Sequence, residues 1–208
     1  MPPIGRLHLI TDTRPGRDAL AVVAAGLAAG ADTVQVRVPD DATDRQAYEL
    51  ASRVLQLCRA HGATCLVNDR LHIALALGAD GGHVGADDLP VAAARLVLGP
   101  AAVLGATARD PVTARQAAAD GASYLGVGPA YATSTKDGLP APIGVTGITA
   151  VARSVDLPVI AIGGVSATRV AELRAAGAYG VAVVGAVSEA VDPGAATAAL
   201  QRALAAAR

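Results

Sequence analysis

The stretch Gly30-Ala31-Asp32-Thr33-Val34-Gln35-Val36-Arg37 points most directly to the fold class, because it joins the end of one helix to a complete short strand. Its glycine can adopt the left-handed conformation that ends a helix at low energetic cost. The same junction recurs at Gly78-Ala79-Asp80, Gly121-Ala122-Ser123 and Gly177-Ala178-Tyr179. The intervals of 48, 43 and 56 residues each have room for two pairs of strand and helix, so the four repeats predict eight strands.

Apolar runs alternate with segments of helical period along the whole chain, as expected for a parallel sheet covered by helices. The expected strands are residues 7–11, 33–37, 64–68, 82–85, 103–107, 124–128, 158–163 and 179–184. We therefore predict a single α/β domain over residues 1–208, a (β/α)8 TIM barrel near the low end of its usual size of roughly 200 to 250 residues. The alternative is a flavodoxin-like open sheet, but that fold uses only about five strands.

The composition excludes several classes of partner. Apolar residues make up 52% of the chain, yet it has no Phe or Trp, only four Tyr, and a net charge of -1. Nucleic-acid binding needs basic surface and aromatic platforms, so we expect no nucleic-acid partner. The sequence shows no signal peptide and no apolar run of about 20 residues, which predicts a cytoplasmic protein without a membrane partner. Small-molecule substrates remain, and a homo-oligomer is compatible with this composition.

One cationic residue differs from the others. Of the 17 lysines and arginines, sixteen are arginines, and Lys136 is the single lysine. It lies in the segment Thr133-Ser134-Thr135-Lys136-Asp137-Gly138, after the sixth expected strand. Because a compact ammonium on a flexible stem suits a phosphate group, we interpret Lys136 as a ligand of a phosphorylated substrate. Chance retention of one lysine is the alternative.

Polar residues gather at the C-terminal ends of the expected strands, which form the active-site face of a barrel. Those after strands two, three and five include Gln35, Arg37, Asn68, Thr107 and Arg109. The seventh strand ends in Gly163-Gly164, and Gly185 follows the eighth. Backbone amides can approach an anion closely at such glycines, which predicts a phosphate site. Relief of crowding at the barrel rim is the alternative explanation.

Two carboxylates follow neighbouring strands on the same face. Asp69 comes after the third expected strand and Asp88 after the fourth, and two oxygen ligands with room for water suit Mg2+. The alternative is that Asp69 pairs with Arg70 while Asp88 caps the next helix. His83, within the fourth strand, is interpreted as a hydrogen-bonded core histidine rather than a proton-transfer group.

In this order, the motifs resemble those of the thiamine phosphate synthase family along nearly the whole chain. The matching blocks are Gln35-Val36-Arg37, Val67-Asn68-Asp69-Arg70, residues 83–90, Gly126-Val127-Gly128-Pro129 with residues 133–136, and Ala161-Ile162-Gly163-Gly164. That family joins hydroxymethylpyrimidine diphosphate to a thiazole phosphate and releases pyrophosphate. The resemblance implies a transferase that makes thiamine phosphate with the assistance of Mg2+.

The resemblance also implies a role for each matching residue. Gln35 and Thr107 would face the pyrimidine, and Asp69 and Asp88 would bind Mg2+. The expected catalytic residues, which would hold the diphosphate, are Arg37, Asn68 and Lys136. The expected ligands of the thiazole and its phosphate are Thr133, Thr135, Gly163, Gly164, Val184 and Gly185.

Three positions depart from the family's pattern. Pro39 stands where a second lysine is usual, Ala86 stands where glutamine is preferred, and Thr107-Ala108-Arg109 replaces a Ser-x-His pattern. Pro39 favours a related barrel, thiazole tautomerase, which uses no metal. Against that alternative, Arg109 stands where the tautomerase has its histidine, and both aspartates are kept. A third alternative is a non-catalytic barrel that binds thiazole phosphate or thiamine phosphate.

Overall fold

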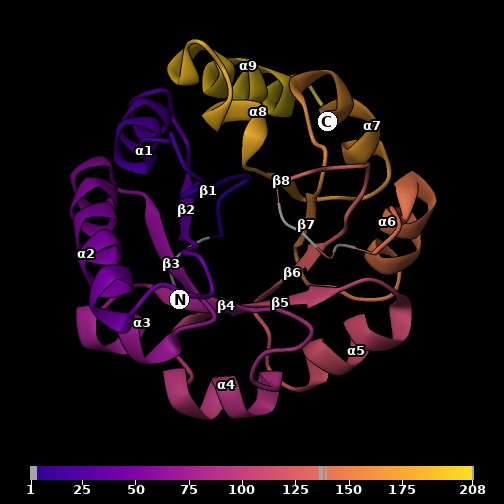
Figure 1. The fold of residues 1–208 in the computed structure, drawn as a ribbon. Helices are drawn as coiled ribbons and strands as arrows, with labels where there is room; N and C mark the ends of the chain where they lie inside the picture. The colour runs from indigo at the N-terminus through magenta and orange to yellow at the C-terminus, as the bar shows by residue number, and fades with distance from the viewer. Residues whose placement is uncertain (1–3, 136–137, 139, 208) are drawn as a thin grey trace.

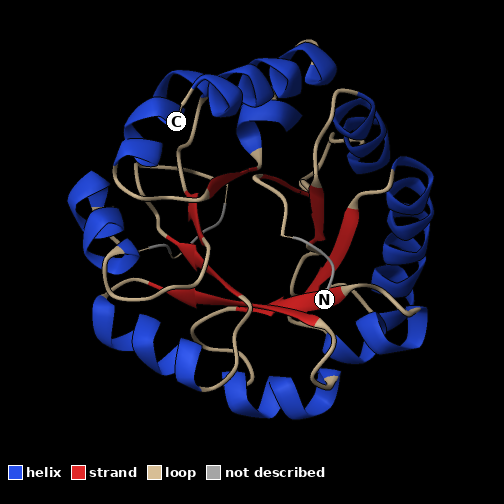
Figure 2. Ribbon diagram, turned by 180° about the vertical axis from the view of Figure 1, so that it is seen from behind, coloured by secondary structure: helices blue, strands red, loops and turns tan. Residues whose placement is uncertain are grey.

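Residues 4–135, 138 and 140–207 are described by a computed structural model, and they form a closed barrel of eight parallel strands. The strands follow one another around the barrel in chain order, and β1 pairs with both β2 and β8. Helices surround the strands on the outside, as the views from the two sides show (Figure 1; Figure 2). The predicted (β/α)8 barrel is confirmed, and the pairing of β1 with β8 excludes the open sheet.

Every predicted strand is present, with ends that lie within one residue of the prediction. The strands are β1 (Leu7–Ile10), β2 (Thr33–Val36), β3 (Thr64–Asn68), β4 (Gly81–Val84), β5 (Val103–Ala108), β6 (Tyr124–Val127), β7 (Val159–Ile162) and β8 (Gly180–Val183). The helices are α1 (Ala19–Ala28), α2 (Asp44–His61), α3 (Leu71–Leu77), α4 (Val91–Leu98), α5 (Pro111–Ala119), α6 (Gly144–Ala152), α7 (Val170–Ala175), α8 (Gly185–Ser188) and α9 (Pro193–Ala206), with a 3-10 turn η1 (Ala167–Arg169) before α7. Within the described ranges, no helix is long and apolar enough to cross a membrane.

The repeated Gly-Ala-Asp junction locks the N-terminal ends of the strands. Its glycine takes a left-handed φ, for example 94° at Gly30 and 61° at Gly78, and so ends the preceding helix. At the two of the four junctions that have an aspartate, its side chain accepts a hydrogen bond from a backbone amide of a neighbouring strand. Asp32 accepts one from the Leu7 amide at 3.1 Å, and Asp80 accepts one from the Cys65 amide at 2.8 Å. The junction therefore sets both the end of a helix and the start of a strand, at the face opposite the polar residues.

Two apolar layers hold the barrel together. The larger lies between the strands and the helices and contains small or branched side chains such as Val34, Cys65 and Val67. The smaller fills the bore and includes Leu66 and Tyr124. Successive residues of a strand point to opposite faces, so β3 contributes to both layers. The chain closes this barrel without Phe or Trp, and Tyr124 supplies an aromatic ring in the bore.

Candidate active site

A cavity of about 940 Å³ opens at the C-terminal ends of the strands. Every predicted site residue that the structure describes lines it: Gln35, Arg37, Asn68, Asp69, Asp88, Thr107, Thr133, Thr135, Gly163, Gly164, Val184 and Gly185. Lys136 lies outside the described residues. The predicted residues come from seven of the eight strand ends or the loops after them, and Ile10 at the end of β1 also lines this space.

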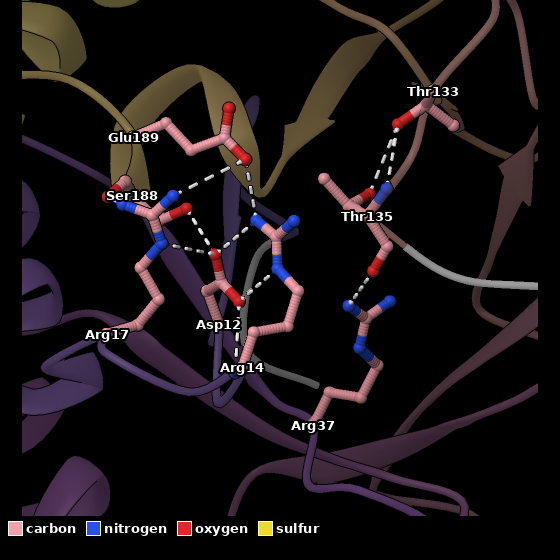
Figure 3. A network of polar contacts seen from close by, with 8 residues as sticks. All are labelled: Asp12, Arg14, Arg17, Arg37, Thr133, Thr135, Ser188 and Glu189. Atoms are coloured by element: carbon pink, nitrogen blue, oxygen red, sulfur yellow. Dashed lines mark hydrogen bonds and ion pairs between the residues drawn. The ribbon is translucent and has the colours of Figure 1, made fainter.

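Arg37 lies just past the end of β2 and links two walls of the cavity. Its backbone amide donates to Thr11 Oγ1 at 2.8 Å, and the Thr11 hydroxyl in turn donates to the Arg37 carbonyl at 2.6 Å. Its guanidinium reaches across to the loop after β6 and donates to the Thr135 carbonyl at 3.0 Å (Figure 3). Burial lowers the pKa of Arg37, but a guanidinium remains protonated in proteins. The site thus holds one oriented cation that is largely removed from solvent.

Thr133 and Thr135 form the part of the same loop that faces Arg37. Their hydroxyl oxygens lie 3.2 Å apart, within hydrogen-bond distance (Figure 3). A Cβ on Gly185 would lie 3.2 Å from Thr135 Cγ2, which places this loop against the start of α8. The predicted diphosphate and phosphate ligands are therefore neighbours across the cavity.

The floor of the cavity is a buried chain of hydrogen bonds. His83 Nδ1 lies 3.0 Å from the Tyr124 hydroxyl, and His83 Nε2 lies 3.1 Å from Thr107 Oγ1. Burial raises the pKa of Tyr124, while a hydrogen bond with Gln35 opposes that rise. The interpretation of His83 as a hydrogen-bonded core residue is confirmed. These hydrogen bonds connect Gln35 with Thr107, the two predicted pyrimidine contacts, through the pair of His83 and Tyr124.

Two glycines make room for this pair. Sequence reasoning quoted Gly126 only within a motif and gave no role to Gly105, Gly126 or Tyr124. A Cβ on Gly105 would lie 2.4 Å from His83 Nδ1 and 2.3 Å from the Tyr124 ring. A Cβ on Gly126 would lie 2.9 Å from His83 Cε1. Glycine in the middle of a strand often marks a close approach of this kind, so Gly105 and Gly126 were the available signal.

Asp69 and Asp88 line the cavity together on the β3 and β4 side. The Asp69 backbone has a φ of 61°, a left-handed conformation that is uncommon for a residue with a side chain. Asp88 Oδ2 accepts the Gly85 amide at 2.7 Å, and the N-cap of α4 is Pro90. The alternative that Asp88 caps α4 is therefore wrong. Arg70 donates to Asp44 at 2.9 Å, which directs its charge toward α2.

The loops after β7 and β8 form the opposite wall. Gly164 has a φ of 62°, and a Cβ there would lie 2.5 Å from the Ala132 carbonyl oxygen. Arg169 donates to the Gly164 carbonyl, and its guanidinium lies 4.1 Å from the centre of the Tyr131 ring. Val184 and Gly185, at the start of α8, complete this wall. The backbone here is packed too tightly for a side chain at Gly164.

Three of the positions that depart from the family pattern line the cavity itself, namely Ala86, Thr107 and Arg109. Pro39 lines a smaller hollow of about 180 Å³ next to Asn68, Asp69 and Asp88. Arg109 donates to the carbonyls of Gly128 at 3.2 Å and Ala141 at 2.7 Å, so it braces the loop after β6.

Comparison with known proteins gives the family. The family model described as thiamine monophosphate synthase matches residues 7–187. The chain belongs to this family. A thiamine-phosphate synthase of Salinispora arenicola is 68% identical over 206 residues, covering 98% of this chain and 99% of that protein. A thiamine-phosphate synthase of Roseiflexus castenholzii is 45% identical and covers 95% of this chain and 88% of its own length.

A solved structure supports the same assignment to the thiamine monophosphate synthase family. The thiamine phosphate pyrophosphorylase of Pyrococcus furiosus superposes with a TM-score of 0.88 at 34% identity, covering 96% of this chain and 95% of that one. A 3-hexulose-6-phosphate synthase superposes with a TM-score of 0.71 at 20% identity, which shows a shared fold alone.

Proposed function

We propose that this chain is a thiamine phosphate synthase, a transferase that joins hydroxymethylpyrimidine diphosphate to thiazole phosphate and releases pyrophosphate. The observation that carries the proposal is the single cavity, which brings together all twelve described residues that the family resemblance implicates. Family membership and full-length relatives named thiamine-phosphate synthase support it.

The pyrimidine diphosphate would bind between the floor and Arg37. Gln35 and Thr107 offer hydrogen-bonding groups to the ring and are themselves oriented by the buried His83 and Tyr124 pair. Arg37 and Asn68, with Lys136, would hold the diphosphate. A guanidinium already oriented by the Thr135 carbonyl needs little reorganisation as charge grows on the leaving group, which is how oriented donors accelerate such a step.

The reaction needs no protein nucleophile. The bond between the pyrimidine methylene carbon and the diphosphate oxygen breaks first, and its electron pair leaves with pyrophosphate. The thiazole nitrogen then supplies the pair that forms the new carbon-nitrogen bond. The task of the protein is to orient the two substrates and to keep water away from the reacting carbon.

Mg2+ is part of the proposal, and the donor set fits it. Asp69 and Asp88 present carboxylates to the same cavity, and hard oxygen ligands with space for water are what Mg2+ requires. Within the described residues, no group of three or more His, Cys, Asp and Glu could form an all-protein metal site. The ion, when bound, would neutralise charge on the diphosphate oxygens.

The thiazole phosphate would bind on the opposite wall. Thr133 and Thr135 would contact the thiazole, and the backbone of Gly163, Gly164, Val184 and Gly185 would receive its phosphate. All four of these residues line the cavity, which supports the assignment of this wall to the phosphate.

The test is to incubate the purified protein with both substrates and Mg2+ and to measure thiamine phosphate by chromatography. We expect product with Mg2+ and none after chelation with EDTA. Isomerisation of the thiazole precursor without the pyrimidine substrate or metal would instead establish the tautomerase alternative. Binding of thiazole phosphate without any product at high enzyme concentration would establish the non-catalytic alternative.

A further inference from the structure

A polar network outside the predicted site joins the loop after β1 to the C-terminal end of α8. Asp12 lies just after β1, and its side chain is 1% exposed. It accepts hydrogen bonds from Arg14 Nε at 2.8 Å, Arg14 Nη2 at 2.6 Å and the Ser188 hydroxyl at 2.6 Å (Figure 3). A buried carboxylate that accepts three side-chain hydrogen bonds is held in one orientation.

The network continues along α8. Arg14 Nη2 also donates to Glu189 Oε1 at 2.7 Å, and Arg17 donates to the Ser188 carbonyl at 3.3 Å. The Ser188 amide is bonded to the Val184 carbonyl at 3.0 Å, and the Glu189 amide is bonded to the Gly185 carbonyl at 3.0 Å. Asp12 and Arg14 therefore hold Ser188 and Glu189. The amides of these two residues are in turn bonded to the carbonyls at the start of α8.

Charge balance indicates what this network does. It contains two carboxylates, Asp12 and Glu189, and two guanidiniums, Arg14 and Arg17, so its formal charge is zero. Hydrogen bonds from Arg14 hold the pKa of Asp12 well below its ordinary value, so the balance persists at neutral pH. A neutral network adds little attraction for an anion, and its contribution is to the position of α8.

We propose that Asp12 is a positioning residue for thiazole phosphate. Through Ser188 and the pair of Arg14 and Glu189, it fixes Val184 and Gly185 in the phosphate wall, the wall formed by the loops after β7 and β8. This inference rests on the proposed function of that wall. Asp12 itself does not line the cavity, whereas Val184, Gly185 and Glu189 do.

Asp12→Asn separates positioning from electrostatics by the sign of its effect. The substitution removes a negative charge near the phosphate wall, so a purely electrostatic role predicts tighter binding of thiazole phosphate. Positioning predicts weaker binding, because the carboxylate accepts with both oxygens and an amide has only one. Oδ1 accepts from Arg14 Nε and Oδ2 accepts from Arg14 Nη2 and the Ser188 hydroxyl, so the NH2 group of the asparagine would face a donor in either orientation. We expect Kd for thiazole phosphate to rise about tenfold, the loss of about one charge-assisted hydrogen bond.

The control is Asp80→Asn, the same substitution at a carboxylate that holds a backbone amide at the opposite end of the barrel. Titration calorimetry gives Kd for thiazole phosphate, and steady-state kinetics give KM for each substrate. We expect Asp12→Asn to raise Kd and KM for thiazole phosphate and leave KM for the pyrimidine diphosphate within twofold. Asp80→Asn should alter the melting temperature but neither KM. Unchanged or tighter thiazole phosphate binding in Asp12→Asn would overturn the proposal, and so would equal losses for both substrates.

Ser188→Ala keeps the test decisive if Asp12→Asn does not fold. It removes one donor to Asp12 and leaves all charges in place, and we expect a rise in Kd for thiazole phosphate of about threefold or more. An unchanged Kd in Ser188→Ala would count against the proposal. Wild-type protein that binds thiazole phosphate without forming product would overturn the synthase activity while leaving the positioning role measurable. Normal turnover with unchanged Kd in both variants would overturn only the positioning role.

Discussion

Gly164→Ala perturbs a crowded point of the wall formed by the loops after β7 and β8, which would receive the phosphate of thiazole phosphate. Gly164 has a φ of 62°, and a Cβ there would lie 2.5 Å from the Ala132 carbonyl oxygen and 2.8 Å from Tyr131 Cβ. The left-handed conformation costs a residue with a side chain about 1 to 2 kcal/mol. Overpacking costs about 1 to 3 kcal/mol more. Ala132 O is a backbone atom and Tyr131 Cβ is bonded directly to the backbone, so neither can move aside without moving the main chain. We expect the loop after β7 to shift and the free energy of unfolding to fall by about 2 to 5 kcal/mol.

Gly62→Ala is the matched control for the conformational part of this cost. Gly62 follows α2 with a φ of 66°, and a Cβ there would have no atom within 4 Å. In a chain of this length, 1 kcal/mol lowers the melting temperature by about 2 to 4 °C. We expect a drop of about 2 to 8 °C for Gly62→Ala and a further drop of about 2 to 12 °C for Gly164→Ala.

Thermal unfolding and steady-state kinetics together measure the prediction. KM for thiazole phosphate should rise about tenfold or more in Gly164→Ala, because a displaced amide loses a hydrogen bond to a charged group. Gly62→Ala should keep the wild-type KM. A Gly164→Ala protein with the melting temperature of Gly62→Ala and an unchanged KM would refute the reasoning, since the loop would then accept a side chain without any effect on the phosphate.

Three further predictions concern pH, the diphosphate cation and the metal. Burial lowers the pKa of His8 from 6.5 to about 4, so between these pH values the unfolded chain binds a proton that the folded chain does not. The free energy of unfolding should therefore fall by roughly 3 kcal/mol as pH drops from about 6.5 to 4, and urea denaturation of His8→Gln should show a flatter pH dependence. Arg37→Ala should lower kcat/KM for the pyrimidine diphosphate about 100- to 1000-fold, while Arg53→Ala, on the exposed side of α2, should not. Asp69→Asn should raise the Mg2+ concentration for half-maximal rate on the order of 100-fold, with the exposed Asp156→Asn as control, and an unchanged Mg2+ requirement would remove Asp69 from the metal site.

The barrel was predictable because its local signals agree with its overall fold. The left-handed glycine of each junction and the apolar run after it act within about ten residues, so the sequence alone reveals them. The candidate site was predictable for a related reason. In a parallel barrel, residues as distant as Arg37 and Gly164 must face the same end once their strands are known.

The network around Asp12 was not predictable, because it depends on how the barrel closes. Asp12 and Ser188 are 176 residues apart and meet only because β1 pairs with β8. The β1 and β8 register aligns Leu9 with Val183, which brings the start of the first loop to α8. No spacing in the sequence gives this register.

The buried floor was missed for a different reason. Tyr124 opens an apolar strand and reads from the sequence as ordinary core. Its hydroxyl matters only because Gly105 and Gly126, on neighbouring strands, leave space for the His83 ring. Three strands must be in register before this arrangement exists, and a pattern within one strand cannot show it.

The central claim is that one cavity couples two phosphorylated substrates, and phosphorus NMR of the complete reaction tests it most directly. With pyrimidine diphosphate, thiazole phosphate and Mg2+, we predict that thiamine phosphate and pyrophosphate form in equal amounts as both substrates disappear. Omitting thiazole phosphate should leave the diphosphate intact over the same period, because the proposed reaction transfers the pyrimidine to the thiazole nitrogen and not to water. Spectra in which both substrates persist at high enzyme concentration, or in which pyrophosphate forms without thiamine phosphate, would contradict the account.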